Sequence, residues 1–588
     1  MECVACHIGI NDSPPAGKTH ARGTAASERV ASCPDCHQKL WEDAQKNNTA
    51  ASKPRLGVVA ANIEAYKNSF HAKIKKGDTQ PLAFCEDCHS SHTFNVPSKD
   101  SPERSTWKLS TADVCGEKCH SDQLDEYKES VHGKAIYDKQ DAKAATCIDC
   151  HTSHSVGNTS AVPIKLAITA NCGNCHTAEY KSYKATYHGQ VSTLGYGNTA
   201  KCFDCHGSHG IAAVKDPASK VHADNRLETC QSCHNGKKAG KAAAGFVSFQ
   251  PHARTDDFHR YPQVFLGFQL MVGLLLGTFG FFWLHTALWF YRELKDRREG
   301  KTTPHIKLDA LPPEYKGKHF RRFSSTWRVA HILFALSLMA LTLTGMPLFY
   351  PDAAWAPWVM KALGGPVVAG NIHRVCAIVF AGVFFWHLAY IAIKIWRQRK
   401  TFRVFGPDSL VPGIQDLKDI IAMFKWFFGK APRPVFDHWT YWEKFDYWAP
   451  FWGVTIIGVS GLMMWLPNLT ATYLPGWVFN VAAIFHGEEA FLAVVFLFTV
   501  HFFNNHFRPD KFPVEIVMFT GTMSLEHYRA EHALEFERLK ASGQLDQYVV
   551  DAPSAPVTWA SKLLGFILIA VGLTLLFGVA VGFFSSLH

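Results

Sequence analysis

CGEKCHSDQLDEYKESVHG at residues 115–133, followed by CIDCHTSH at 147–154, is a unit that the chain repeats. The same pattern returns as CGNCHTAEYKSYKATYHG at 172–189 and CFDCHGSH at 202–209. A looser copy consists of Cys33, AYKNSFHAK at 65–73 and CEDCHSSH at 85–92. Each unit therefore has two Cys–Cys–His signatures and, between them, a short amphipathic Tyr–Lys helix that ends in histidine.

Eight such signatures occupy the first 234 residues and use 16 of the 17 cysteines. Seven have two residues between the cysteines, whereas Cys115 and Cys119 have three between them. The spacing lets two thiols bond the vinyl groups of one haem while the adjacent histidine reaches the iron. Zinc sites and disulfides do not need that histidine, so we expect eight covalently bound c-type haems. The attachment residues are Cys3, Cys6, Cys33, Cys36, Cys85, Cys88, Cys115, Cys119, Cys147, Cys150, Cys172, Cys175, Cys202, Cys205, Cys230 and Cys233, and the proximal ligands are His7, His37, His89, His120, His151, His176, His206 and His234.

Eight further histidines in this region equal the haems in number. Three follow a signature histidine by three residues, and three end the Tyr–Lys helix. We expect them to be the sixth ligands of the irons, because a second histidine closes an iron to substrate. The alternative is a solvated loop histidine. The candidates are His20, His71, His92, His132, His154, His188, His209 and His222, and His252 or His259 could substitute.

Composition predicts an extracytoplasmic, haem-packed, loop-rich and mostly α multihaem cytochrome c domain at residues 1–260. The segment has too few apolar residues for an ordinary core, and porphyrins would supply the buried surface. It carries 31 Lys and Arg against 28 Asp and Glu. Eight haems would add a charge of about −16 through their propionates, so the chain's net charge of +10 does not indicate nucleic-acid binding.

The remaining sequence predicts an all-α membrane domain of six transmembrane helices, a four-helix haem b bundle with flanking helices. Each apolar stretch has the roughly 20 residues that a bilayer requires. A charged amphipathic stretch at 410–429 is expected on the membrane surface. The six spans are expected at 264–290, 327–349, 367–396, 445–466, 478–506 and 557–584.

Loop charges predict the orientation in a bacterial inner membrane. Ten Lys and Arg lie in 291–322, nine in 397–444 and five in 507–556. The alternate loops are nearly free of them, with one at 350–366 and none at 467–477. By the positive-inside rule, the haem domain and the C-terminus are then periplasmic.

Histidines within the predicted spans are the leading candidates for b-type haem ligands. His373 and His387 are fourteen residues apart, and His486 and His501 fifteen. About four helical turns separate the members of each pair, so both face one side of the helix, roughly 21 Å apart. That layout suits two stacked b haems, and His331 on the second span is a further candidate. His285, His438 and His506 are expected at interfaces, without haem ligation.

STWRVAHILFALSLMALTLTGMPLFYPD at 325–352 and EKFDYWAPFWGVTIIGVSGLMMWLPN at 443–468 resemble the dihaem cytochrome b subunits of membrane formate dehydrogenases and nickel-iron hydrogenases. The resemblance covers about 320–510. It implies an outer haem held by His373 and His486, and an inner haem held by His331 and His501. His387 departs from this pattern and suits the cytochrome b of quinol–cytochrome c reductases. His331 and His387 therefore compete for the inner haem.

The complete arrangement is similar to the inner-membrane quinol-oxidising cytochromes of metal-respiring bacteria. This resemblance implies a quinol:cytochrome c-type oxidoreductase that passes electrons from menaquinol to periplasmic c-type cytochromes or other redox proteins. Glu488 and Glu489 are candidates for quinone-linked proton transfer. Reverse electron flow, a terminal reductase with one open c haem, and an anchor subunit of a larger respiratory complex remain alternatives. The expected domains are 1–260, 261–323, 324–510 and 511–588, the second holding the first span and a cytoplasmic linker and the last a cytoplasmic segment and the sixth span.

Overall fold

The computed structural model describes residues 33–77, 81–89, 96–98, 100–235, 241–301 and 311–586. The chain forms two compact units, Met1–Lys181 with Gly197–Cys230 and Ser182–Tyr196 with Gln231–His588. Its regular structure is nearly all helical, which confirms the mostly α prediction. The expected domain limits at 260, 323 and 510 stay predictions.

The haem-signature region consists of short helices joined by loops. A small apolar cluster of Ala112, Leu124, Tyr127 and Ile136 packs within it. Its helices are α1 (Cys33–Lys46), η3 (Ala50–Ser52), α2 (Pro54–Lys67), α3 (Cys85–Cys88), α4 (Glu103–Leu109), α5 (Thr111–Gly116), α6 (Ser121–Glu129), α7 (Val131–Tyr137), α8 (Cys147–His151), α9 (Val162–Gly173), α10 (Thr177–Lys184), α11 (Tyr187–Thr193), α12 (Cys202–His206), α13 (Arg226–Cys233) and η4 (Ala244–Ser248).

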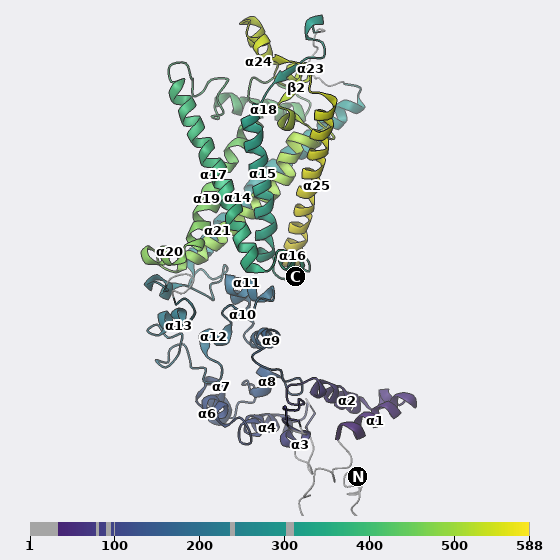
Figure 1. Ribbon diagram of the computed structural model, residues 1–588, viewed down its shortest axis with the longest axis vertical. Helices are drawn as coiled ribbons and strands as arrows, with labels where there is room; N and C mark the ends of the chain where they lie inside the picture. The colour runs from purple at the N-terminus through teal and green to yellow at the C-terminus, as the bar shows by residue number, and fades with distance from the viewer. Residues whose placement is uncertain are drawn as a thin grey trace, which may run out of the picture. The chain divides into compact units, whose positions relative to one another are not determined.

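Among the described residues, six helices are long and apolar enough to cross a membrane, as the sequence predicts. In Figure 1 they run side by side in the second unit. Helix α15 packs against α17, α21 packs against both α19 and α14, and α25 packs against α15. The helices are α14 (Pro262–Arg298), α15 (Ser325–Phe349), α17 (Pro366–Arg397), α19 (Tyr441–Trp465), α21 (Trp477–Phe496) with its π-helical continuation to Phe507, and α25 (Ala555–Ser586).

Local sequence fixes where these helices start. Pro262 and Pro366 occupy the first helical position of α14 and α17, where the missing N–H costs nothing. Helix α19 begins with a capping box, in which the backbone N–H of Thr440 donates to Glu443 Oε2 at 2.9 Å.

The connecting elements divide between the two ends of the bundle. Helices α16 (Ala356–Ala362) and α20 (Pro467–Tyr473) lie at one end together with the chain terminus, and α18 (Ile414–Phe427), α23 (Leu525–Glu531) and α24 (Ala533–Ala541) lie at the other (Figure 1). Helix α18 is the predicted amphipathic stretch. It buries Trp426 and Phe427 in a cluster with Trp289 of α14 and Trp442 of α19.

The membrane unit also contains a small sheet, so the all-α prediction was incomplete. Strands β1 (His319–Arg321), β2 (Thr522–Ser524) and β3 (Val549–Val550) pair antiparallel in the order β2–β1–β3. Strands of two or three residues are too short to show an alternating pattern. The remaining short helices are η5 (Pro313–Tyr315), α22 (Val517–Thr520) and η8 (Leu545–Gln547).

A π-helical stretch ends the fifth span, in η6 (Leu497–His501) and η7 (Phe503–Phe507). In a regular α-helix, fifteen residues turn about 60° beyond four full turns, which would place His486 and His501 on diverging faces. The wider π turn advances by a smaller angle per residue. It therefore brings His501 back towards the face that carries His486.

Candidate functional site

The second signature of each repeat folds as a short capped helix, α3, α8 or α12. In each, the aspartate before the second cysteine accepts a hydrogen bond from the backbone N–H of the residue preceding the first cysteine. The distances are 2.8 Å for Phe84–Asp87, 2.8 Å for Thr146–Asp149 and 2.9 Å for Lys201–Asp204. This cap satisfies a helix-end donor and orients both thiols and the following histidine.

The histidine that ends the Tyr–Lys segment also has a fixed backbone. Ser130 Oγ accepts from the Gly133 N–H at 2.9 Å and so caps α7, which carries His132. A Cβ on Gly133 would lie 1.9 Å from the Tyr127 carbonyl oxygen, so only glycine permits this turn. Thr186 and Gly189 repeat the arrangement in α11, which carries His188.

The structure brings five proximal histidines beside a distal candidate. Bonds from a metal to an imidazole nitrogen are about 2.0–2.1 Å, so two imidazoles on opposite faces of one iron have ring centres about 6.3 Å apart. The five pairs fit an iron between their rings. They are His120 with His71 (6.3 Å), His89 with His154 (6.0 Å), His176 with His132 (6.2 Å), His151 with His209 (6.3 Å) and His234 with His188 (6.3 Å).

The surroundings of four of these rings favour the neutral imidazole, which is the ligating form. Burial lowers the pKa of these four, and the paired imidazole lowers it further. The histidines with both contributions are His71, His89, His132 and His151.

Cysteines of successive signatures lie next to each other. The thiols of Cys115 and Cys147 hydrogen-bond, and so do those of Cys172 and Cys202. Burial raises the pKa of three further thiols, each of which also interacts with a cysteine of a neighbouring signature. These pairs are Cys85 with Cys33, Cys88 with Cys119 and Cys150 with Cys172.

Other predicted residues of this region stay predictions. Cys3, Cys6, His7, His20 and His92 lie outside the described residues. His222 Nδ1 lies 3.4 Å from the Asp224 carboxylate. His252 Nδ1 hydrogen-bonds to Ser182 Oγ at 3.1 Å, and His259 packs edge-on against Phe258. His37 and His206 also stay predictions as proximal ligands.

In the membrane unit, His331 lies beside His501 with ring centres 6.5 Å apart, and His373 lies beside His486 at 6.2 Å. Both distances fit two imidazoles on one iron. A Cβ on Gly461 would lie 3.1 Å from His486 Cε1, so this glycine leaves room for the imidazole.

Hydrogen bonds orient these imidazoles through Nδ1. Thr344 Oγ1 lies 2.8 Å from His373 Nδ1. The Ile457 carbonyl oxygen lies 3.0 Å from His486 Nδ1, and Asp446 Oδ2 lies 3.1 Å from His501 Nδ1. With Nδ1 occupied, Nε2 is the atom available to a metal, and such partners typically fix the tautomer of a ligand.

His387 has a different environment from the paired histidines. Its Nε2 hydrogen-bonds to the Tyr447 hydroxyl of α19 at 2.9 Å, and its ring packs edge-on against Trp327 at 4.8 Å. Its Nδ1 is buried without a hydrogen-bond partner. Trp386 and Tyr390, which flank it on α17, are each 39% exposed on the apolar surface of the bundle.

The predicted proton-transfer carboxylates differ in exposure. Glu489 is 1% exposed and accepts from Trp452 Nε1 at 3.1 Å. Glu488 is half-buried.

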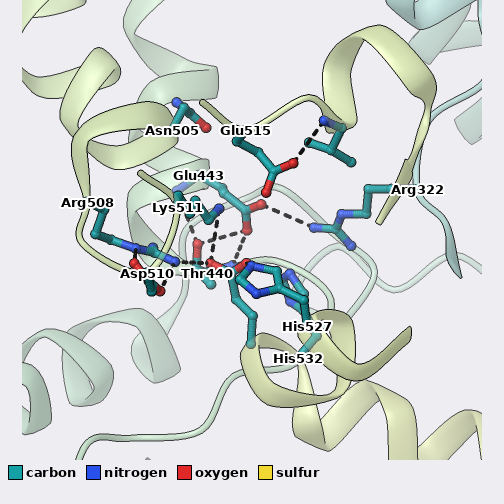
Figure 2. A network of polar contacts seen from close by, with 12 residues as sticks. Arg322, Thr440, Glu443, Asn505, Arg508, Asp510, Lys511, Glu515, His527 and His532 are labelled. Carbon is teal, nitrogen blue, oxygen red and sulfur yellow. Dashed lines mark hydrogen bonds and ion pairs between the residues drawn. The ribbon is translucent and has the colours of Figure 1, made fainter. Parts of the chain in front are cut away.

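A buried ionic network, which we call the polar cap, joins residues of several segments (Figure 2): Arg322, Glu443, Arg508, Asp510, Lys511 and Glu531. At its centre, Arg508 is fully buried and bonds both oxygens of Asp510, at 2.6 and 2.8 Å, and Glu531 at 2.7 Å. Lys511 lies 3.3 Å from Glu531. In a second part, Arg322 contacts Glu443 at 3.2 Å. The sequence does not predict this cap, because its charges come from segments far apart in the chain.

One cluster next to the polar cap, Asp408, His438 and Glu535, has the donor set of a metal site. However, Arg538 lies 3.1 Å from Asp408 and 3.8 Å from Glu535. Its guanidinium already supplies the positive charge that these carboxylates need, so we assign the cluster to the ionic network.

Comparison with known proteins supports the cytochrome b resemblance. No family model matches the chain. Over 170 residues it is 24% identical to the cytochrome b556 subunit of formate dehydrogenase from Haemophilus influenzae, which covers 28% of this chain. The chain matches 62% of the length of that curated relative. With the six apolar helices, this similarity supports a multipass membrane protein with a cytochrome b-like domain, a b-type haem and a role in membrane electron transfer.

Proposed function

We propose that this protein transfers electrons from menaquinol to redox proteins outside the cytoplasm, through two b-type and eight c-type haems, in a bacterial inner membrane with the repeats and the C-terminus in the periplasm. The observation that carries the proposal is the set of seven histidine pairs with ring centres 6.0–6.5 Å apart. Bound haems would supply one-electron carriers. A second histidine closes each of these irons, which favours electron transfer over substrate reduction.

We place the quinol headgroup at His387 and Tyr447. The unpartnered Nδ1 of His387 can accept a proton from a quinol hydroxyl, and the Tyr447 hydroxyl can orient the ring. The site adjoins the apolar surface at Trp386, where a lipid-soluble quinol arrives. Tyr447 also follows Asp446, which contacts the inner ligand His501. The site is therefore close to an electron acceptor.

Glu488 and Glu489 remain candidates for a second proton-transfer position, beside His486. Glu489 is sealed from the bilayer and already accepts from Trp452. This supports a proton-relay role for Glu489 more than direct contact with quinol.

The test is anaerobic mixing of the purified oxidised protein with a menaquinol analogue, followed by haem absorbance. We expect b-haem reduction followed by c-haem reduction. His387→Ala should slow the first phase by about 10²-fold, whereas Glu489→Gln should retain it and slow only steps linked to proton release. If quinol reduces no haem and quinone re-oxidises none, the proposal is wrong.

The similarity to one subunit of formate dehydrogenase favours a second candidate, an electron-transferring membrane subunit of a larger complex. Purification under mild conditions distinguishes the two. A stoichiometric dehydrogenase or reductase subunit would support this candidate.

A further inference from the structure

The five histidine pairs of the c-type region all join different parts of the repeat array. We define repeat A as residues 33–92, repeat B as 115–154 and repeat C as 172–209. In every pair the two histidines belong to different repeats, or to repeat C and the signature that follows it. None of these five pairs joins two histidines of one repeat.

In each repeat, the distal histidine of the Tyr–Lys segment pairs with the proximal histidine of the next signature downstream of that repeat. His71 of repeat A pairs with His120 of repeat B, and His132 of repeat B pairs with His176 of repeat C. His188 of repeat C pairs with His234 of the final signature.

The distal histidine that follows the second signature of a repeat pairs with the proximal histidine of the second signature in the preceding repeat. His154 of repeat B pairs with His89 of repeat A, and His209 of repeat C pairs with His151 of repeat B. Each boundary between two complete repeats is therefore crossed twice, once in each direction.

We propose that neighbouring repeats exchange iron ligands reciprocally, so that no iron held by the five described pairs takes both of its histidines from one repeat. This inference rests on the proposed attachment of c-type haems and extends it to the source of every described sixth ligand. The local structure holds the Tyr–Lys segment of each repeat in a fixed position. The Tyr127 hydroxyl donates to the Ala145 carbonyl oxygen at 2.7 Å, two residues before Cys147, and Tyr66 bonds Ala83 in the same way at 2.6 Å. This tie and the cap at Ser130 fix His132 on its own helix, with its ring beside His176.

The exchange predicts which haem opens when one distal histidine is removed. His132→Ala in the full-length protein should convert one haem iron, about one in ten, from low to high spin. Electron paramagnetic resonance and carbon monoxide binding measure this conversion, and added imidazole should restore the low-spin state. His527→Ala, which removes a histidine that lies 3.7 Å from Glu531 of the polar cap, should leave every haem low-spin.

A second substitution identifies the open haem. Cys172→Ser with Cys175→Ser removes the haem of repeat C that His176 ligates. In that background His132→Ala should give no high-spin signal, because the affected iron is absent. Removing the haem of repeat B through Cys147→Ser and Cys150→Ser should leave the signal intact. The opposite pattern, with loss of the signal only in the Cys147→Ser, Cys150→Ser background, overturns the exchange.

Haem content separates this inference from the proposed function. A count other than eight covalent haems per unaltered chain contradicts the c-type chain itself. If His132→Ala loses haem, His132→Met should fold with a ligand in place and raise the potential of one haem, which the same cysteine backgrounds identify. A raised potential that persists without the repeat C haem contradicts the exchange.

Discussion

Replacing Arg508 with methionine should open the polar cap. The fully buried Arg508 guanidinium neutralises Asp510 and Glu531 at 2.6–2.8 Å. Burial alone raises the pKa of Asp510, but Arg508 overcomes this and holds the pKa well below its usual range. Methionine keeps the apolar stem and leaves two buried carboxylates without their main partner.

The structure sets the size of this effect. Removing one partner of a buried ion pair costs about 3–5 kcal/mol. Lys511 still lies 3.3 Å from Glu531, and Arg433 lies 4.0 Å from Asp510, so we expect the lower limit of about 3 kcal/mol. That loss of stability increases the equilibrium constant for opening of the cap by about 10²-fold.

Hydrogen exchange of amides in α23 and α24 measures this opening directly. Arg508→Met should accelerate their exchange by about 10²-fold, and Arg508→Lys should do so less. Adding Asp510→Asn should partly restore protection in the methionine variant, because it removes one uncompensated charge. Unchanged exchange in Arg508→Met, or faster exchange in the double variant, would refute the reasoning.

Three other substitutions or conditions give separable results. Asp446→Asn should raise the midpoint potential of one b haem in a redox titration, because the carboxylate no longer makes His501 more basic; two unchanged b potentials would contradict the pairing. Gly133→Ala should add one high-spin haem, since its Cβ would meet the Tyr127 carbonyl oxygen at 1.9 Å; a fully low-spin spectrum would show that the turn relaxes. Burial and the charge of Arg322 lower the pKa of His532 to about 4, against about 6.5 unfolded. The unfolded chain then binds more protons between these values, so lowering the pH from 7 to 5 should destabilise the cap by about 2 kcal/mol. Limited proteolysis of residues 507–556 at increasing urea concentrations measures this loss of stability. His532→Gln should reduce the difference between pH 7 and pH 5, and an equal pH effect in that variant would contradict the assignment.

The sequence predicts the helices better than their contacts. The six spans and the amphipathic α18 follow from apolar length and periodicity, which are local properties. The sheet could not be predicted, since its strands meet only after residues 319–321 and 522–524 are brought together by the fold. The buried charges of Arg508 and Glu531 resemble ordinary loop charges until their burial is known.

The histidine pairs show the same limit. The number of histidines outside the signatures identified the candidate sixth ligands of the irons. Their positions in the repeat divided them into those that end the Tyr–Lys helix and those that follow a signature. The partners could not be assigned, because His71 and His120 are separated by a signature, a loop and two helices. For His387, the sequence offered haem ligation, and only its contact with Tyr447 indicated another role. The structure therefore adds which histidine of a neighbouring repeat or signature pairs with each candidate ligand.

The contacts between thiols of different signatures bear on whether haem attachment or folding comes first. Cys115 hydrogen-bonds to Cys147, and Cys172 to Cys202, although the members of each pair belong to different signatures. In an oxidising compartment, two unmodified thiols in contact form a disulfide. A chain that folded before its cysteines reacted would therefore crosslink its signatures and exclude the haems. If the signatures carry c-type haems in the periplasm, as we propose, thioether formation therefore has to come first, on an unfolded chain, and folding then proceeds around cofactors already in place.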